Sequence, residues 1–123
     1  MIKSISFLPQ FIPLIKSGKK TVTRRFKTKL KDGDIVYFKI GRTGKKEGYI
    51  KIISVKIEPL KDIIYSYGKE EPQKEGCKDL RDFMRVWDSI HGFSSWRDNP
   101  GIYRIEFKHL GKELKQLLKE SEE

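Results

Sequence analysis

The segment from Gly18 to Arg25 carries the densest set of chemically active side chains in the sequence. It reads Gly-Lys-Lys-Thr-Val-Thr-Arg-Arg. Lysine offers a point charge, arginine a planar fork that matches a phosphate, and threonine a hydroxyl that can donate a hydrogen bond or attack a carbonyl. These residue types predict a pocket for an anion or a nucleotide. The candidate binding residues are Lys19, Lys20, Thr21, Arg24, Arg25 and Lys27.

The same segment also fits a second interpretation, a basic edge strand whose charges discourage pairing with another sheet. Its spacing is not that of a phosphate-cradling loop of the form G-x-x-x-x-G-K, so the spacing leaves both interpretations open. In an extended strand Lys20 and Thr23 face opposite sides, because side chains alternate. The two side chains can meet in one pocket only if the backbone bends after Gly18.

The remaining reactive groups are isolated in the sequence. Glu75 stands in a polar stretch, where a glutamate is ordinarily solvated. Cys77 is the single cysteine, which excludes an internal disulfide and a cysteine-cluster zinc site, and no histidine stands near it to activate it. His91 and His109 are too few and too far apart for a metal site or a catalytic triad. We therefore expect no metal and no cofactor.

Aromatic residues offer a different route to ligand binding, because a ring can stack on a nucleobase. Trp87 lies on an apolar stripe with helical spacing, so we expect it in the core. Trp96, Tyr65 and Tyr67 lie in less regular segments, and the sequence does not choose among them as stacking platforms.

Net charge is distributed unevenly along the chain. The protein has 123 residues, with 27 lysines and arginines, 17 aspartates and glutamates, and a formal net charge of +10. Residues 1–31 contain nine basic side chains and no acidic one, so they account for +9 of that total. A segregated basic segment concentrates polyanions, whereas evenly spread lysines mainly keep a protein soluble. The charge therefore favours an anionic partner, such as RNA or a nucleotide-like ligand.

Length and composition exclude several classes of protein. A chain of this length folds as one domain around one core. A hydrophobic content of 37% and an aromatic content of 11% exclude a disordered polyelectrolyte. The apolar runs fall far short of the roughly 20 residues that cross a membrane, and the N-terminus lacks the unbroken apolar stretch of a signal peptide. We expect a cytoplasmic protein, and its richness in lysine, glutamate and isoleucine is typical of thermophilic sources.

The clearest alternation of apolar and polar residues predicts two strands, at residues 35–40 and 49–57, joined by a polar hairpin loop. In the second strand apolar residues occupy even positions up to Ile52 and odd positions from Ile53 onwards. A phase slip of this kind predicts a β-bulge, which is how small sheets bend.

Less regular patterns complete the expected secondary structure. Further strands are expected at residues 4–7, 19–26 and 102–107, the second being either a strand or an extended loop. Helices are expected at residues 9–17, 59–67, 80–90 and from Leu110 onwards, with polar loops at 68–78 and 93–100. The helix at 80–90 is the clearest, because its apolar residues recur at helical spacing and Gly92 follows them. Strands of mixed order with helices between them indicate an α+β domain with a curved sheet.

In the order and spacing of four pieces, the sequence resembles the ASCH domain, a branch of the PUA-like fold. The pieces are Gly18–Arg25, Asp32–Val36, Glu75–Gly76 followed by Phe83 and Trp87, and Tyr103–Phe107. The resemblance covers about residues 3–108. It implies a small, curved, mostly antiparallel β-barrel with flanking helices and a cleft near the Gly-Lys-Lys segment. Residues 1–123 then form a single domain, with 109–123 as a C-terminal helical extension.

The resemblance also implies which residues act on a ligand. ASCH domains are associated with RNA or nucleotide-like ligands, and some small bacterial members are amidohydrolases that remove the acetyl group from acetylcytidine. By motif, the catalytic lysine, threonine and glutamate of those enzymes match Lys20, Thr23 and Glu75. Lys20 would deprotonate Thr23, while Glu75 would orient Lys20 or pass a proton to the leaving amine. This sequence departs from the small enzymes at Arg24, where an apolar residue is expected.

Two functions from different classes therefore remain open. In the first, the chain binds RNA or a nucleotide-like ligand in a basic cleft formed by Gly18–Arg25, because the local charge exceeds what one nucleoside needs. In the second, Lys20, Thr23 and Glu75 hydrolyse an acylated nucleoside or, as a metal-independent ribonuclease, RNA. A structural or regulatory protein without a ligand is a third interpretation.

Overall fold

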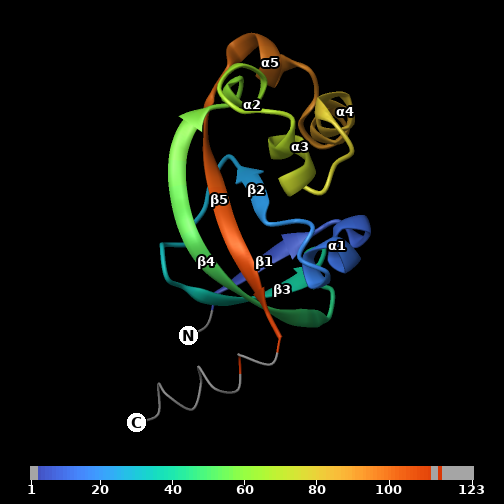
Figure 1. Ribbon diagram of the computed structural model, residues 1–123, viewed down its shortest axis with the longest axis vertical. Helices are drawn as coiled ribbons and strands as arrows, with labels where there is room; N and C mark the ends of the chain where they lie inside the picture. Colours follow the sequence, from blue (N-terminus) through green and yellow to red (C-terminus); the bar gives the residue numbers. More distant parts are fainter. Residues whose placement is uncertain (1–2, 112–113, 115–123) are drawn as a thin grey trace.

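The computed structural model describes residues 3–111 and residue 114, and places five strands in one sheet (Figure 1). The strands are β1 (Ser4–Phe7), β2 (Val22–Arg25), β3 (Ile35–Ile40), β4 (Lys46–Pro59) and β5 (Gly101–Leu110). Their order across the sheet is β1-β3-β4-β5-β2. Only the pairing of β1 with β3 is parallel, and the other three pairings are antiparallel. The predicted α+β class and the mostly antiparallel sheet are confirmed.

The two longest strands, β4 and β5, run side by side and curve together (Figure 1). Their register shifts between Ile52 and Ser54, which is the position of the predicted β-bulge. Ile52 is 1% exposed and faces the core, whereas Ile53 is 45% exposed. The extra residue in β4 therefore explains why the apolar phase of the sequence changes at this point.

The sheet is curved but not closed, so the predicted barrel is wrong in this respect. β1 and β2 are its two edge strands, and no backbone ladder joins them among the described residues. Each of these strands is only four residues long. The side chain of Arg25 connects the two edges instead, since its Nη2 donates a 2.7 Å hydrogen bond to the carbonyl oxygen of Ser6.

Within residues 3–111 six short helical segments accompany the sheet, and α2 to α5 gather at one end of β4 and β5 (Figure 1). They are the 3-10 helix η1 (Pro9–Phe11), α1 (Ile12–Lys16), α2 (Asp62–Tyr65), α3 (Glu70–Lys74), α4 (Leu80–His91) and α5 (Ser94–Asp98). No helix in the described part of the chain has the length and apolar character needed to span a bilayer.

The predicted helix at residues 80–90 is confirmed as α4. Asp79 caps its first turn by accepting a 2.8 Å hydrogen bond from the backbone N–H of Asp82, and Gly92 ends it with a φ of +79°. Phe83 and Trp87 point into the core from its apolar face. The helix thus brings one wall of aromatic side chains towards the sheet.

Two of the predicted loops contain helices, α3 and α5. Each is only five residues long, so neither shows a hydrophobic repeat. In α3, Glu70 and Glu71 lie in the first turn and Lys74 in the last, which is the charge order that the helix dipole favours. The predicted C-terminal helix lies mostly outside the described residues, and Leu110 belongs to β5.

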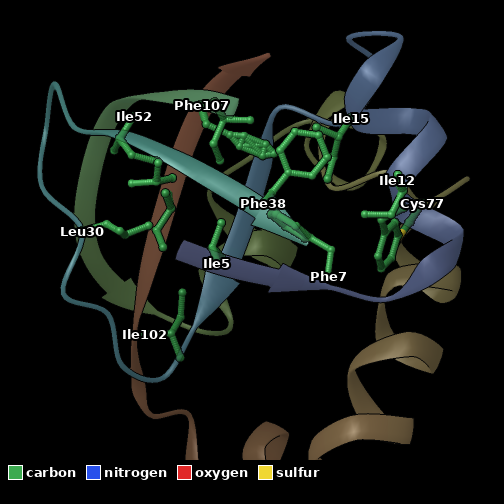
Figure 2. Close-up of a cluster of buried hydrophobic side chains, with 14 of the residues drawn as sticks. Ile5, Phe7, Ile12, Ile15, Leu30, Phe38, Ile52, Cys77, Ile102 and Phe107 are labelled. Carbon is green, nitrogen blue, oxygen red and sulfur yellow. The ribbon is translucent and has the colours of Figure 1, made fainter. Parts of the chain in front are cut away.

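The core lies against the concave sheet and beneath α1 and α4. Figure 2 draws this cluster, with Phe7 and Phe38 among its central side chains. The ring of Phe7 meets the rings of Phe38 and Phe107 edge to face, with centroid distances of 6.3 and 5.8 Å. This packing fixes β1 against β3 and β5, and it holds in place the edge strand that contributes Ser6 and Phe7 to the candidate site.

Candidate functional site

The bend that the sequence requires after Gly18 is present. Gly18 has a φ of +81° and ends α1, as predicted. The backbone N–H groups of Lys19 and Lys20 then both donate to the carbonyl oxygen of Leu14, each at 2.9 Å. Because these two residues still wrap around the end of α1, the alternation of β2 begins only at Val22. Lys20 therefore turns inwards, and only 3% of it is exposed.

The ammonium group of Lys20 is surrounded by three hydrogen-bond acceptors. Its Nζ donates to the carbonyl oxygen of Val22 at 2.8 Å, to the carbonyl oxygen of Glu75, and to Glu75 Oε1 at 3.4 Å. The Nζ also lies 4.5 Å from the centre of the Phe11 ring. An ammonium has three N–H donors, so this geometry satisfies all of them when Lys20 is charged.

Burial nevertheless lowers the pKa of Lys20 below its usual value, because the charged form loses its hydration. The carboxylate of Glu75 opposes that effect, and the neighbouring Arg25 adds to it. The charge of Lys20 therefore depends on a balance between its burial and the carboxylate of Glu75.

Glu75 reaches Lys20 because α3 ends beside the bend. Glu75 follows α3 directly and is 4% exposed, not solvated as a loop glutamate ordinarily is. The next residue, Gly76, has a φ of +88°, and a Cβ there would lie 3.2 Å from Lys20 Cδ and 3.0 Å from Phe11. A glycine at this position therefore leaves room for Lys20 to cross to Glu75.

Arg24 joins the site to a second group of buried charges. Its Nη1 donates to Glu75 Oε2 at 2.8 Å, and its Nη2 donates to Glu71 Oε2 at 2.7 Å. Arg104 holds Glu71 with two hydrogen bonds, from Nε at 2.6 Å and from Nη2 at 3.0 Å. Burial pushes the pKa of Glu71 upwards, but hydrogen bonds from Arg104 and Arg24 outweigh it and hold that pKa below its usual value.

Glu71 and Arg104 were not predicted from the sequence. The four-residue spacing of Glu71 and Glu75 fits one face of a helix, but α3 is too short to show the repeat that would predict a helix there. Arg24 and Arg104 are also direct register partners on β2 and β5, and two facing arginines need carboxylates between them. The side chain of Arg24 is 1% exposed and is held within this network.

Thr23 and Arg25 lie on the other face of β2. Arg25 Nε donates to Thr23 Oγ1 at 3.2 Å, and Arg25 Nη2 donates to the carbonyl oxygen of Ser6. Burial lowers the pKa of Arg25, and Glu75 opposes this. A guanidinium nevertheless stays charged at any physiological pH. Among the described contacts no hydrogen bond joins Lys20 to Thr23, although both line the same cavity.

That cavity has a volume of about 290 Å³ and lies between β2 and α4. Its polar wall consists of Lys20, Thr23, Arg25 and Glu75, together with the network residue Arg24. The rest of the lining is mainly apolar and aromatic: α4 supplies Phe83, Val86, Trp87 and His91, while Phe11 and Phe7 lie beside Lys20 and Arg25. The arrangement combines flat apolar surfaces with a small number of converging donors and acceptors, which is typical of a small-molecule site.

Trp87 is the central aromatic side chain of this wall. Its ring packs against His91 and Phe26, with centroid distances of 4.3 and 5.3 Å. Its Nε1 is buried and has no acceptor among the described residues. Burial, aided by the charge of Arg25, lowers the pKa of His91 below its usual value, so this ring is neutral at pH 7.

The other predicted site residues lie elsewhere. Lys19 is exposed and Thr21 half-buried, and neither lines the cavity. Lys27 is exposed and lines a separate groove beside β1.

The aromatic residues left open as stacking platforms also lie outside the cavity lining. The hydroxyl of Tyr67 donates to Glu58, and its ring lies near both Arg24 and Arg104. Trp96 Nε1 donates to Asp88 Oδ1 at 2.6 Å, and Tyr65 is exposed on α2. Trp87, which was expected in the core, is the tryptophan that reaches the cavity.

Cys77 also lines the cavity, where it behaves as a small apolar side chain. Burial, reinforced by Glu75, raises the pKa of its thiol to about 12, which removes the thiolate needed for nucleophilic attack at neutral pH. No three His, Cys, Asp or Glu side chains in the described ranges cluster closely enough to hold a metal ion.

Solved structures that resemble this one include three of different origin. A hypothetical protein, PH0355, matches with a TM-score of 0.66 and 21% identity, over 89% of this chain and 100% of that one. An ASCH domain from Lactobacillus crispatus JV V101 matches with a TM-score of 0.58 and 14% identity, over 87% of this chain and 79% of that one. ASCH from Zymomonas mobilis matches with a TM-score of 0.56 and 17% identity, over 85% of this chain and 65% of that one. No protein-family model and no curated protein matches the sequence.

Proposed function

We propose that this chain, which has the fold of the ASCH domain, binds the nucleobase of an RNA or nucleotide-like ligand in the cavity between β2 and α4. The observation that carries the proposal is the division of the cavity into an aromatic wall and a polar wall. A nucleobase has the same division, with apolar faces and a polar edge, and proteins bind unstacked bases by stacking on the faces and hydrogen-bonding to the edge.

The size of the cavity supports a single base. Pockets for small molecules usually measure about 300–1,000 Å³, and a volume of about 290 Å³ lies at the lower end of that range. A single base or nucleoside therefore fits better than a stacked pair. The ring of Trp87, held by Phe83 and His91, offers a rigid surface against which the base can pack.

The polar wall offers both kinds of hydrogen-bonding group. Glu75 presents carboxylate oxygens that can accept from an amino or imino group, while Thr23 and Arg25 can donate to a carbonyl oxygen or a ring nitrogen. Arg25 uses two of its five N–H donors on Thr23 and Ser6, so three remain. A base edge carries donors and acceptors together, and this wall matches that mixture.

Calorimetric titration with a panel of ribonucleosides tests the proposal. Val86 lines the cavity, and Val86→Phe fills part of it, so the variant should lose at least about tenfold in affinity. Met84 lies on the same helix but lines a different groove, which makes Met84→Phe the matched control. Circular dichroism establishes that both variants are folded. Equal affinity in the two variants, or no nucleoside binding to the unmodified protein, contradicts the proposal.

A second candidate, hydrolysis of an acylated nucleoside such as acetylcytidine, draws support from the convergence of Lys20 and Glu75 in the cavity that Thr23 also lines. In this reaction Lys20 takes the hydroxyl proton of Thr23, whose oxygen forms a bond to the amide carbonyl carbon. The carbon–nitrogen bond then breaks, the amine leaves with that proton, and water hydrolyses the acyl-threonine. Binding ranks first because Thr23 Oγ1 accepts from Arg25 and Lys20 Nζ is fully occupied by other acceptors.

Chromatographic assays separate the two candidates. A hydrolase releases cytidine and acetate from acetylcytidine, and Lys20→Ala and Thr23→Val each abolish that release. A ribonuclease instead cleaves a short RNA in the presence of a metal chelator. If the folded protein binds nucleosides and produces neither reaction across a panel of acylated nucleosides and RNAs, the catalytic candidate is excluded and binding stands.

A further inference from the structure

A second cavity adjoins the nucleobase cavity and has a different chemical character. It measures about 420 Å³ and runs along β1 and the segment that follows β2. We call it the edge groove, because it follows the open edge of the sheet. Its polar lining consists of Lys3, Arg25, Lys27, Lys29, Ser4, Ser6 and Thr28. None of the residues lining this groove is acidic.

The two cavities share a wall. Ser6 and Arg25 line both of them, and the hydrogen bond from Arg25 Nη2 to the carbonyl oxygen of Ser6 forms the boundary. Three N–H donors of Arg25 are left at this boundary after its bonds to Thr23 and Ser6. The guanidinium of Arg25 therefore lies where a ligand in the nucleobase cavity can extend into the edge groove.

The cations of the edge groove are not equally available. Lys3 Nζ already donates to Asp34 at 3.1 Å and to the carbonyl oxygen of Lys29 at 2.7 Å. Lys27 and Lys29 are exposed, and no ion pair of either side chain occurs among the described residues. Arg25, Lys27 and Lys29 therefore bring three positive charges to the lining of the groove, with Thr28 between the two lysines in sequence.

We infer that the edge groove binds the phosphate group of the ligand whose base occupies the nucleobase cavity. The inference rests on the proposed function, and it specifies the ligand as a nucleoside phosphate, either a mononucleotide or one residue of an RNA strand. Arginine matches a phosphate with two parallel hydrogen bonds, and lysines add point charge. The remaining length of the groove accommodates the continuing phosphodiester backbone when the ligand is RNA.

A comparison of ligands with and without phosphate tests this inference. The ligands are the nucleoside that binds best, its 3′- and 5′-monophosphates, a short RNA, and a phosphodiester oligomer without bases. The variant is Lys27→Gln/Lys29→Gln, and the control is Lys56→Gln/Lys69→Gln, which removes the same charge from exposed positions outside both cavities. Calorimetry at low and moderate salt gives each affinity.

The inference predicts that a phosphate improves affinity at least about tenfold at low salt, because hydrogen bonds to charged groups are the strong ones. The variant in the groove loses this gain and keeps the affinity for the nucleoside, whereas the control keeps both. In a plot of the logarithm of RNA affinity against the logarithm of salt concentration, the slope becomes shallower by about one unit for each phosphate contact removed. If only RNA binds more tightly than the nucleoside, the natural ligand is an RNA strand. If a monophosphate gains as much affinity as RNA does, the natural ligand is a mononucleotide.

The outcomes separate this inference from the proposed function. If nucleosides bind and phosphate adds nothing, the edge groove is not a phosphate site although the nucleobase cavity stands. If nucleosides fail to bind while the base-free oligomer binds through Lys27 and Lys29, the groove stands and the proposed function falls. If neither ligand binds, or if the control variant loses as much as the groove variant, the inference is overturned.

Discussion

At the scale of single residues, Lys20 is the side chain on which the site depends most. Its ammonium is enclosed by Val22 and Glu75, yet burial acts against its charge. A buried lysine can be neutral near physiological pH, which suits a general base, or charged, which suits an anion site. Its charge state therefore separates the two candidate functions more sharply than any other property of the site.

The stability of the protein should report that charge state. Because burial lowers the pKa of Lys20 in the folded protein, the unfolded chain binds more protons between that lowered pKa and the ordinary lysine value. The free energy of unfolding must then rise with pH across this window. The difference in stability between the unmodified protein and Lys20→Met should therefore grow as pH rises through the window.

Urea unfolding at a series of pH values from neutral to about 10 measures this difference. Lys19→Met, at the exposed neighbouring position, serves as the control and should leave the pH profile unchanged. A difference for Lys20→Met that stays flat or shrinks with pH would mean that Glu75 and the backbone carbonyls fully compensate the loss of hydration.

The structure brings some of the predicted site residues together at one cavity and places others elsewhere. The alternation of residues 19–26 showed that Lys20 and Thr23 could share a pocket only if the backbone bent after Gly18, and the structure has that bend. Glu75 was indicated by the resemblance alone, and it lies buried beside Lys20. Arg24 was expected to bind the ligand, but it is buried between Glu71 and Glu75. Whether a basic side chain faces a ligand or an internal carboxylate depends on the element packed against it. For Arg24 that element is α3, which is too short to be predicted from the sequence.

At the scale of secondary-structure elements, Arg24 is the connection between β2 and α3. It bonds both Glu71 and Glu75, so one side chain fixes the helix that carries Glu75 relative to the strand that carries Thr23. Removing it leaves two buried carboxylates without that partner. Breaking a buried ion pair by deleting one member usually costs about 3–5 kcal/mol.

We therefore expect Arg24→Met to lower the free energy of unfolding by about 3–5 kcal/mol, as measured by urea denaturation. Arg97→Met is the matched control, because the side chains of Arg97 and Asp98 form an exposed pair on α5. Exposed pairs contribute less than about 1 kcal/mol. Comparable losses in the two variants would show that the buried network does not stabilise the attachment of α3.

The secondary-structure elements differ in how well the sequence predicted them. The slip in apolar phase at Ile53 predicted the bulge of β4 correctly, because one extra residue reverses which side chains face the core. α3 and α5 escaped prediction because a helix of five residues has too few turns for a repeat. That the sheet stays open also escaped prediction, since strand alternation does not record which edges pair.

At the scale of the whole molecule, the uneven charge is partly internal. Of the nine basic residues in the first 31, Lys20 and Arg24 are buried against carboxylates that come from much later in the chain. Lys3 and Lys16 form partly exposed pairs with Asp34 and Glu47. The positive surface is therefore smaller than the sequence suggested, and part of it lies along the edge groove.

The resemblance to the ASCH domain predicted the fold correctly from four short pieces, and the solved structures confirm it. Those pieces fall at the bend and in β2, at the start of β3, at the end of α3, within α4 and within β5. The identity of a ligand leaves no comparable trace, because cavity shape depends on contacts between distant segments such as β2 and α4. Function must therefore be measured at the cavity itself.

The most direct measurement is a nuclear magnetic resonance titration of the nitrogen-15-labelled protein with a nucleoside, observing the two tryptophan indole signals. The chain has two tryptophans, of which Trp87 lines the nucleobase cavity, while Trp96 does not line it and is hydrogen-bonded to Asp88. The account predicts that the Trp87 signal shifts saturably and that the Trp96 signal moves much less. A titration in which neither signal moves, or in which Trp96 moves at least as much as Trp87, would contradict it.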